Sequence, residues 1–143
     1  MSTCFDASAL IKLLLDEGDS EIAGALWTDT QDAFVSTVGY AELRGSISRA
    51  LRGGRIRPDA YPTVRVELEQ LWGSLVEIRL EGSLPRHAGV LADRHGLGAL
   101  DAIHLASALG IATPTDRPTF VTFDRRLAEA AIAEGLAVLP EVA

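Results

Sequence analysis

LGALDAIHLASAL, residues Leu97–Leu109, predicts an almost wholly apolar helix that follows a glycine-marked turn. A helix that is apolar on nearly every side belongs in the interior of a protein. Asp101 is the only acidic residue in this stretch. Because a buried carboxylate is costly unless a positive group meets it, Asp101 either contacts a basic side chain or a metal ion, or it caps the helix and faces water.

On both sides of this stretch, short apolar runs alternate with amphipathic segments, as is typical of an α/β protein. Strands separated by helices pair in parallel through right-handed crossovers. We therefore expect a three-layer α/β/α fold, with a central parallel sheet of four to five strands flanked by helices. The expected strands are 3–5, 33–35, 76–80, 119–122 and a final edge strand at 137–139, and the expected helices are 7–15, 20–27, 38–51, 58–72, 84–95, 97–109 and 125–134.

The composition of the chain predicts a single globular domain over residues 1–143, since 48% of the residues are hydrophobic and 23% are charged. A lone cysteine, Cys4, cannot form an internal disulfide, and neither a secretory signal nor a membrane-length apolar run is visible. We expect a cytoplasmic protein that does not contact a membrane. The net charge of −7 argues against nonspecific coating of nucleic acid, but not against an enzyme that acts on it.

Three acids outside the opening stretch are candidates for the same site. Asp6 and Asp124 each follow a predicted strand and open a helix, so each could be only an N-cap, worth about 1 kcal/mol. In parallel sheets, however, ligands bind beyond the carboxyl ends of the strands. Glu42 lies in the first turns of a helix with no basic residue before Arg44 and Arg49. It is either a solvated acid that the helix dipole favours or a member of the site.

Taken together, the four acids favour a metal site. Two unit charges about 4 Å apart interact by about 4 kcal/mol at an effective dielectric near 20, and a divalent cation removes this repulsion. Ligation by oxygen alone indicates Mg²⁺ or Mn²⁺ rather than zinc. Such a cation can activate water and neutralise charge on a phosphoryl oxygen. The acids therefore predict metal-assisted hydrolysis of phosphodiesters.

Four segments also carry a family resemblance. The chain resembles the PIN-domain ribonucleases, and specifically the VapC-type toxins of bacterial toxin–antitoxin pairs. The matching segments occur in the order of the family and span essentially the whole chain: FDASALIKLLLDE from residue 5, STVGYAELRGSISRA from residue 36, LGALDAIHLASAL, and FVTFDRRLAEAA from residue 120.

This resemblance implies a PIN-like fold with an acidic pocket for Mg²⁺ or Mn²⁺. The catalytic and metal-binding acids of the family fall on Asp6, Glu42, Asp101 and, at its most variable position, Asp124; Asp116 is a poor substitute because it lies in the preceding loop. The resemblance further implies an RNA substrate, a small VapB-like antitoxin as partner, and assembly as a homodimer or a toxin–antitoxin hetero-oligomer. The supporting hydroxyl residues of the family correspond to Ser8 and Thr122, which as plain cap and strand residues would orient nothing.

Several other residues have two interpretations. The basic cluster after Glu42 either binds RNA phosphates, forms a solvated face or binds an antitoxin; its candidates for RNA contact are Arg44, Arg49 and Arg52. His104, three residues after Asp101, is expected to be a hydrogen-bonded core residue rather than a ligand or proton shuttle. Trp27 and Trp72 are expected in the core or an interface.

Two other functions remain to be separated from metal-dependent RNA cleavage. The chain could be a PIN module that only binds RNA or protein, although all four acids are present. It could also be a phosphoryl-transfer hydrolase of the haloacid-dehalogenase or receiver kind, with Asp6 as nucleophile. That second alternative lacks an acid at position 8 and any lysine after Lys12 to meet a phosphoryl group.

Overall fold

A five-stranded, wholly parallel sheet forms the centre of the protein in the computed structural model, which describes residues 2–142. The strands are arranged in the order β3-β2-β1-β4-β5. Their bounds are β1 Ser2–Phe5, β2 Asp32–Ser36, β3 Val76–Ile78, β4 Thr119–Val121 and β5 Ala137–Leu139. The predicted parallel sheet is therefore confirmed, including its edge strand.

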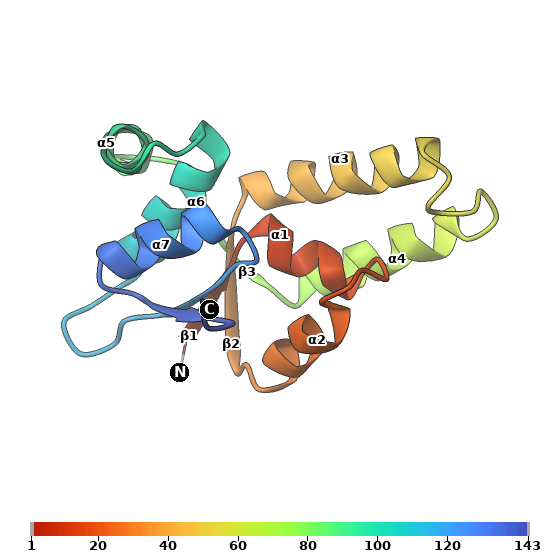
Figure 1. Ribbon diagram of the computed structural model, residues 1–143, viewed down its shortest axis with the longest axis horizontal. Coiled ribbons are helices and arrows are strands. Elements are labelled where there is room, and N and C mark those ends of the chain that lie inside the picture. Colours follow the sequence, from red (N-terminus) through yellow and green to blue (C-terminus); the bar gives the residue numbers. More distant parts are fainter. Residues whose placement is uncertain (1, 143) are drawn as a thin grey trace.

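Helices cover both faces of this sheet (Figure 1). Their bounds are α1 Ala7–Leu10, the 3₁₀ turn η1 Ile11–Leu13, α2 Ser20–Thr28, α3 Val38–Arg52, α4 Tyr61–Gly73, α5 Leu84–His95, α6 Ala99–Gly110 and α7 Arg125–Ala133. Side chains alternate along the strands, so that Cys4 and Phe120 pack with α5–α7, while Phe5 and Val121 pack with α1–α4. This alternation produces the three layers that the sequence predicts.

The helix expected over 97–109 begins at Ala99 and the strand expected over 76–80 ends at Ile78, and two other predicted helices differ more. The helix expected over 58–72 begins at Tyr61, because the amides of Ala60 and Tyr61 donate to Arg57 O in a preceding turn. Pro62 then occupies the first helical turn, where its missing N–H costs nothing. The helix expected over 7–15 is split into α1 and η1, because Leu14 N closes a tighter turn onto Ile11 O.

The opening stretch forms a central helix, as its composition predicts. Six residues of α6 are buried: Ala102, His104, Leu105, Ala106, Ser107 and Ala108. Its apolar side chains join the core that Cys4 and Phe120 form with α5 and α7. Asp101 in the first turn is only half-buried. The helix therefore holds one carboxylate at the boundary between the core and the sheet edge.

The strand order places a topological switch point between β1 and β4. From β1 the chain continues to β2 and β3 on one side, and then crosses to β4 and β5 on the other. Phe5 and Val121 are register partners, and Asp6 N donates to Val121 O at 3.2 Å. The residues that follow these two strands therefore meet at the carboxyl edge of the sheet, where parallel folds bind ligands.

Within residues 2–142, no helix is both long and apolar enough to cross a lipid bilayer.

A glycine allows α3 to approach the sheet and α6 closely. A Cβ on Gly39 would lie 3.0 Å from Val35 Cγ2 and 3.6 Å from both His104 Cε1 and Trp72 Cη2. Val35 and His104 are fully buried. The contact with Val35 would be tighter than most real Cβ contacts, so a Cβ at position 39 requires Val35 or α3 to shift by a few tenths of an ångström.

Replacing this glycine is expected to destabilise the fold. Gly39→Ala should lower the free energy of unfolding by roughly 1–2 kcal/mol, because the added methyl overpacks a stiff neighbour. The matched control is Gly89→Ala in the exposed middle of α5, where no atom lies within 4 Å of the new Cβ. That control should stabilise the protein by about 0.5–1 kcal/mol. Urea unfolding of both variants measures the contrast, and equal stabilisation by both would contradict it.

Candidate active site

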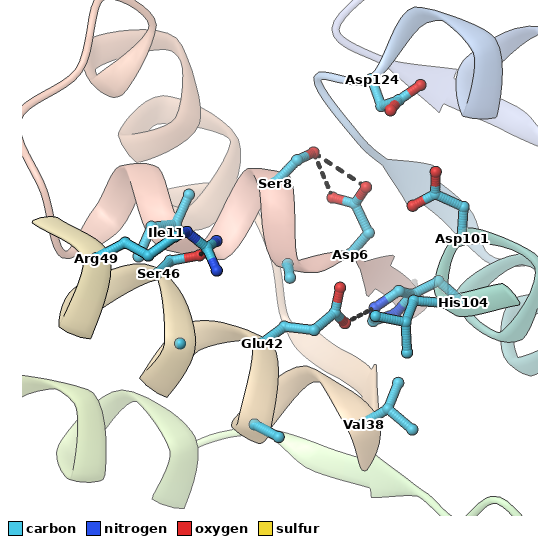
Figure 2. Close-up of a pocket in the computed structure, with 14 residues that line it drawn as sticks. Asp6, Ser8, Ile11, Val38, Glu42, Ser46, Arg49, Asp101, His104 and Asp124 are labelled. Carbon is cyan, nitrogen blue, oxygen red and sulfur yellow. Dashed lines mark hydrogen bonds and ion pairs between the residues drawn. The ribbon is translucent and has the colours of Figure 1, made fainter. Parts of the chain in front are cut away.

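A cavity of about 600 Å³ opens at the carboxyl edge of the sheet. It is lined by the four predicted acids, which come from four separate segments of the chain, namely Asp6, Glu42, Asp101 and Asp124. Asp6 follows β1, Glu42 lies on α3, Asp101 on α6, and Asp124 follows β4. Figure 2 shows Asp101 and Asp124 on one side of Asp6, with Glu42 on the other.

Asp6 is buried, and three donor groups hold its carboxylate. Its carboxylate accepts from Ser8 Oγ at 2.7 Å, from Thr122 Oγ1 at 2.6 Å and from Ala9 N at 3.0 Å. Burial raises the pKa of Asp6 above its ordinary value, although the nearby His104 and these hydrogen bonds oppose the shift. Asp6 is therefore an N-cap and a cavity residue at once.

Ser8 and Thr122 connect the loops that follow β1 and β4. Besides donating to Asp6, Ser8 Oγ accepts from Phe123 N at 3.0 Å. Thr122 Oγ1 likewise accepts from Asp124 N at 3.0 Å. The two hydroxyls thus hold the loop that carries Asp124 against the carboxylate of Asp6.

The remaining two aspartates lie nearer to solvent. Asp124 caps α7, because its Oδ1 accepts from Leu127 N at 3.0 Å. The pKa of Asp101 is raised, first by burial and then by the negative charges of Asp124, Asp6 and Glu42, with His104 acting in the opposite direction. The three other carboxylates are therefore close enough to disfavour the ionisation of Asp101.

Glu42 has a basic partner that local sequence analysis did not identify. His104 Nε2 lies 2.5 Å from Glu42 Oε1, although the two residues are 62 positions apart (Figure 2). Burial lowers the pKa of His104, but the hydrogen bond and the charge of Glu42, together with Asp6 and Asp101, outweigh it, so that the pKa is raised. His104 is fully buried, and its Nδ1 has no hydrogen-bond partner within residues 2–142. It is thus the hydrogen-bonded core histidine that was expected, and it ties α6 to α3.

The donor set suits a hard divalent cation, because such cations prefer carboxylate oxygens. The raised pKa of Asp101 also reflects an excess of negative charge that a cation would relieve. The carboxylates are not yet arranged around a common point as the ligands of a bound metal ion would be, however. Within residues 2–142, no three acidic, histidine or cysteine side chains are already gathered around one point.

The predicted basic residues do not all face the cavity. Arg49 lines it, together with Ser46. Arg44 instead donates to Tyr40 OH at 3.0 Å, and Arg52 donates to Ser48 Oγ at 2.6 Å. The apolar lining of the cavity, from Ile11, Val38 and Leu100 among others, was not anticipated, since these residues carry no chemical signature in the sequence.

Two further predictions concern residues outside the cavity. Asp116 lies in the loop before β4, where its N–H contacts Thr113 Oγ1, and it does not line the cavity. Trp27 packs against Phe5 and Trp72 against Tyr40, with ring centroids 5.5 and 5.4 Å apart. The tryptophans are therefore part of the core on the α1–α4 face, as expected.

Comparison with known proteins assigns the family. The sequence model of the PIN domain matches residues 3–133, a span that contains all four acids. The chain belongs to the PIN domain family. This PIN domain is 36% identical to ribonuclease VapC45 of Mycobacterium tuberculosis (strain CDC 1551 / Oshkosh) over 136 residues, which cover 95% of this chain and 93% of that protein.

Solved structures share the fold of this PIN domain. PAE2754 from Pyrobaculum aerophilum matches it with a TM-score of 0.69 and 19% identity, covering 97% of this chain and 92% of that one. A toxin–antitoxin complex from Klebsiella pneumoniae matches with a TM-score of 0.57 and 20% identity, covering 85% and 86% respectively. The recognised PIN-like α/β/α architecture is therefore confirmed.

Removing one acid is expected to stabilise this PIN domain when divalent metal is absent. A raised pKa in the folded state means that folding favours the protonated form of Asp101, so its contribution to stability is lost as the pH rises through that pKa. Asp101→Asn should therefore melt roughly 2–4 °C above wild type at neutral pH in chelator. The difference should narrow as the pH falls below about 4, the ordinary pKa of an aspartate, because the side chain then becomes protonated in the unfolded state as well.

Asp93→Asn is the control for this experiment, because Asp93 is an exposed aspartate on α5 outside the cavity. It should melt within about 1 °C of wild type. An Asp101→Asn variant that is less stable than wild type at neutral pH in chelator would show that the carboxylates do not repel one another.

Proposed function

We propose that this PIN domain is a Mg²⁺- or Mn²⁺-dependent endoribonuclease that hydrolyses RNA phosphodiester bonds. One observation carries the proposal: four carboxylates from four segments line a single cavity at the switch point of a parallel sheet. Nothing in the packing of the fold requires four acids there, and the charges of the other three raise the pKa of Asp101, which a bound cation would oppose. The similarity to a ribonuclease over most of the chain supports the same activity.

Asp6, Asp101 and Asp124 would hold the cation, with Glu42 either joining them or orienting the attacking water. When bound, the cation would activate water and neutralise charge on the phosphoryl oxygens. Ser8 and Thr122 keep the Asp6 carboxylate in one orientation, since ligating carboxylates depend on such hydrogen bonds. Their contribution is positional, because neither hydroxyl needs to contact the RNA.

Glu42 is placed to act as a general base toward the attacking water. His104 binds one carboxylate oxygen, and Figure 2 shows the other oxygen directed into the cavity. That free oxygen can accept a hydrogen bond from the water that attacks phosphorus. As the new P–O bond forms, the water would give a proton to Glu42, the bond from phosphorus to one ester oxygen would break, and the departing oxygen would take up a proton from solvent.

The geometry disfavours Asp6 as a nucleophile. Lys12, the one lysine of the chain, contacts Glu17 at 3.3 Å and lies over the ring of Phe123. It does not line the cavity, so it does not meet a phosphoryl group there. A covalent aspartyl-phosphate intermediate is therefore not part of the proposal.

A small antitoxin protein is the proposed partner. The relative from Mycobacterium tuberculosis carries the name of a VapC ribonuclease, and one structure with this fold is that of a toxin–antitoxin complex. We infer that the chain is the toxin of such a pair and that it assembles as a homodimer or a toxin–antitoxin hetero-oligomer. Addition of the cognate antitoxin should then suppress the RNA cleavage described next.

RNA cleavage tests the proposed activity. Purified wild type should cleave RNA in Mg²⁺ or Mn²⁺ and stop cleaving in chelator. Asp6→Asn and Asp101→Asn should each reduce the rate by roughly 100-fold or more, since each removes one oxygen ligand from the cation. Gel analysis of end-labelled RNA measures the rates.

Asp93→Asn should cleave like wild type, because its side chain is exposed on α5 and outside the cavity. Two results would reject the proposed activity. One is wild type that leaves RNA intact with both metals, which would favour the non-catalytic binding module. The other is cleavage that survives unchanged in Asp6→Asn and Asp101→Asn.

A further inference from the structure

The cavity is longer than the group of acids that it contains. Along α3 it is lined by Glu42, Gly45, Ser46 and Arg49, a spacing that places these residues on one helical face. Arg49 lies seven positions after Glu42, which corresponds to about 10 Å along the helix axis. Figure 2 shows Arg49 and Ser46 on the far side of Glu42 and Ser8 from Asp101 and Asp124. The cavity therefore has an acidic end and a basic end.

Arg49 differs from the two other arginines of α3 that the sequence offered for RNA contact. Arg44 Cζ lies 5.7 Å from the centre of the Tyr40 ring, and Arg52 bonds Ser48 near the end of the helix. Neither residue lines the cavity. Arg49 is the one arginine or lysine among the lining residues that the structure describes.

Local structure holds the Arg49 guanidinium over the cavity. Its Nη2 donates to Ser46 Oγ at 3.2 Å. A Cβ on Gly45 would lie 3.6 Å from Arg49 Nη1, so the guanidinium folds back toward the acidic end, as helical side chains do. Within residues 2–142, no carboxylate lies within ion-pair distance of it. Its remaining N–H groups are thus available to a ligand.

An RNA strand that enters this cavity needs a cationic group beside the four carboxylates. The proposed cation would neutralise the phosphate at the acidic end, but the neighbouring phosphates would face four carboxylates. A guanidinium binds phosphate oxygens through two parallel hydrogen bonds and stays charged at any working pH. We propose that Arg49, held by Ser46, anchors a backbone phosphate flanking the scissile one. The proposal rests on the proposed ribonuclease function and makes Arg49 a positioning residue.

The first test measures RNA binding without cleavage. In an Asp101→Asn background, a short fluorescein-labelled oligouridylate is titrated and followed by anisotropy at several salt concentrations. Arg49→Gln should raise Kd about tenfold and reduce the salt dependence by about 0.7 in the logarithmic slope. Arg49→Lys should recover part of the affinity. Arg52→Gln, an exposed arginine on the same helix, should change Kd less than about twofold.

The second test locates the phosphate. An RNA that wild type cleaves at one bond is prepared with single methylphosphonates, each of which neutralises one phosphate. In wild type, a methylphosphonate at one flanking position should raise KM about tenfold and leave kcat unchanged. In Arg49→Gln, the same position should have no further effect, because its partner is already missing.

Thermal melting of each variant confirms that it is folded, as expected for an exposed side chain. The inference fails if Arg49→Gln and Arg52→Gln weaken binding equally, or if every methylphosphonate acts alike in wild type and Arg49→Gln. These failures are distinct from a failure of the proposed function. If the proposed function is wrong, wild type will cleave no RNA. The binding test would still show whether Arg49 contacts an RNA phosphate.

Discussion

Electrostatic repulsion among four carboxylates is the constraint on which the architecture of this site depends. The strand order β3-β2-β1-β4-β5 brings the loops after β1 and β4 together, and α3 and α6 bring the two remaining acids to the same cavity. Each aspartate there raises the cost of ionising Asp101. A protein that needed only helix caps could place neutral serine or asparagine at these positions with similar benefit. The charge is therefore better explained by a ligand than by the fold.

The protein offsets this repulsion with groups that also fix geometry. Asp6 accepts from two hydroxyls and a helix amide, and Asp124 accepts from the amide of Leu127. His104 brings a buried imidazole from α6 to Glu42 on α3. Capping does not exclude ligand binding by Asp124, because its Oδ1 caps α7 while the residue also lines the cavity.

The sequence predicted those features that depend on local patterns of residues. Hydrophobic periodicity located the strands, and an acid after an apolar strand predicted the positions of Asp6 and Asp124 at the sheet edge. The pairing of Glu42 with His104 could not be predicted locally, because it depends on how α3 and α6 pack in space; the only hint was that His104 lies one turn after Asp101. Arg44, Arg49 and Arg52 are equivalent in sequence, and only the structure separates Arg49 by its place in the cavity. The start of α4 at Tyr61 was missed because two prolines, Pro58 and Pro62, each suit a first helical turn.

Calorimetric titration of metal-depleted protein with Mn²⁺ tests the central claim most directly, since it measures the cation site without any RNA. Wild type should bind Mn²⁺, and its affinity should rise with pH as Asp101 and Asp6 lose their protons. Asp101→Asn should weaken binding by roughly 10-fold or more. Wild-type protein that takes up no Mn²⁺ at neutral pH, or an Asp101→Asn variant that binds it equally well, would contradict the account.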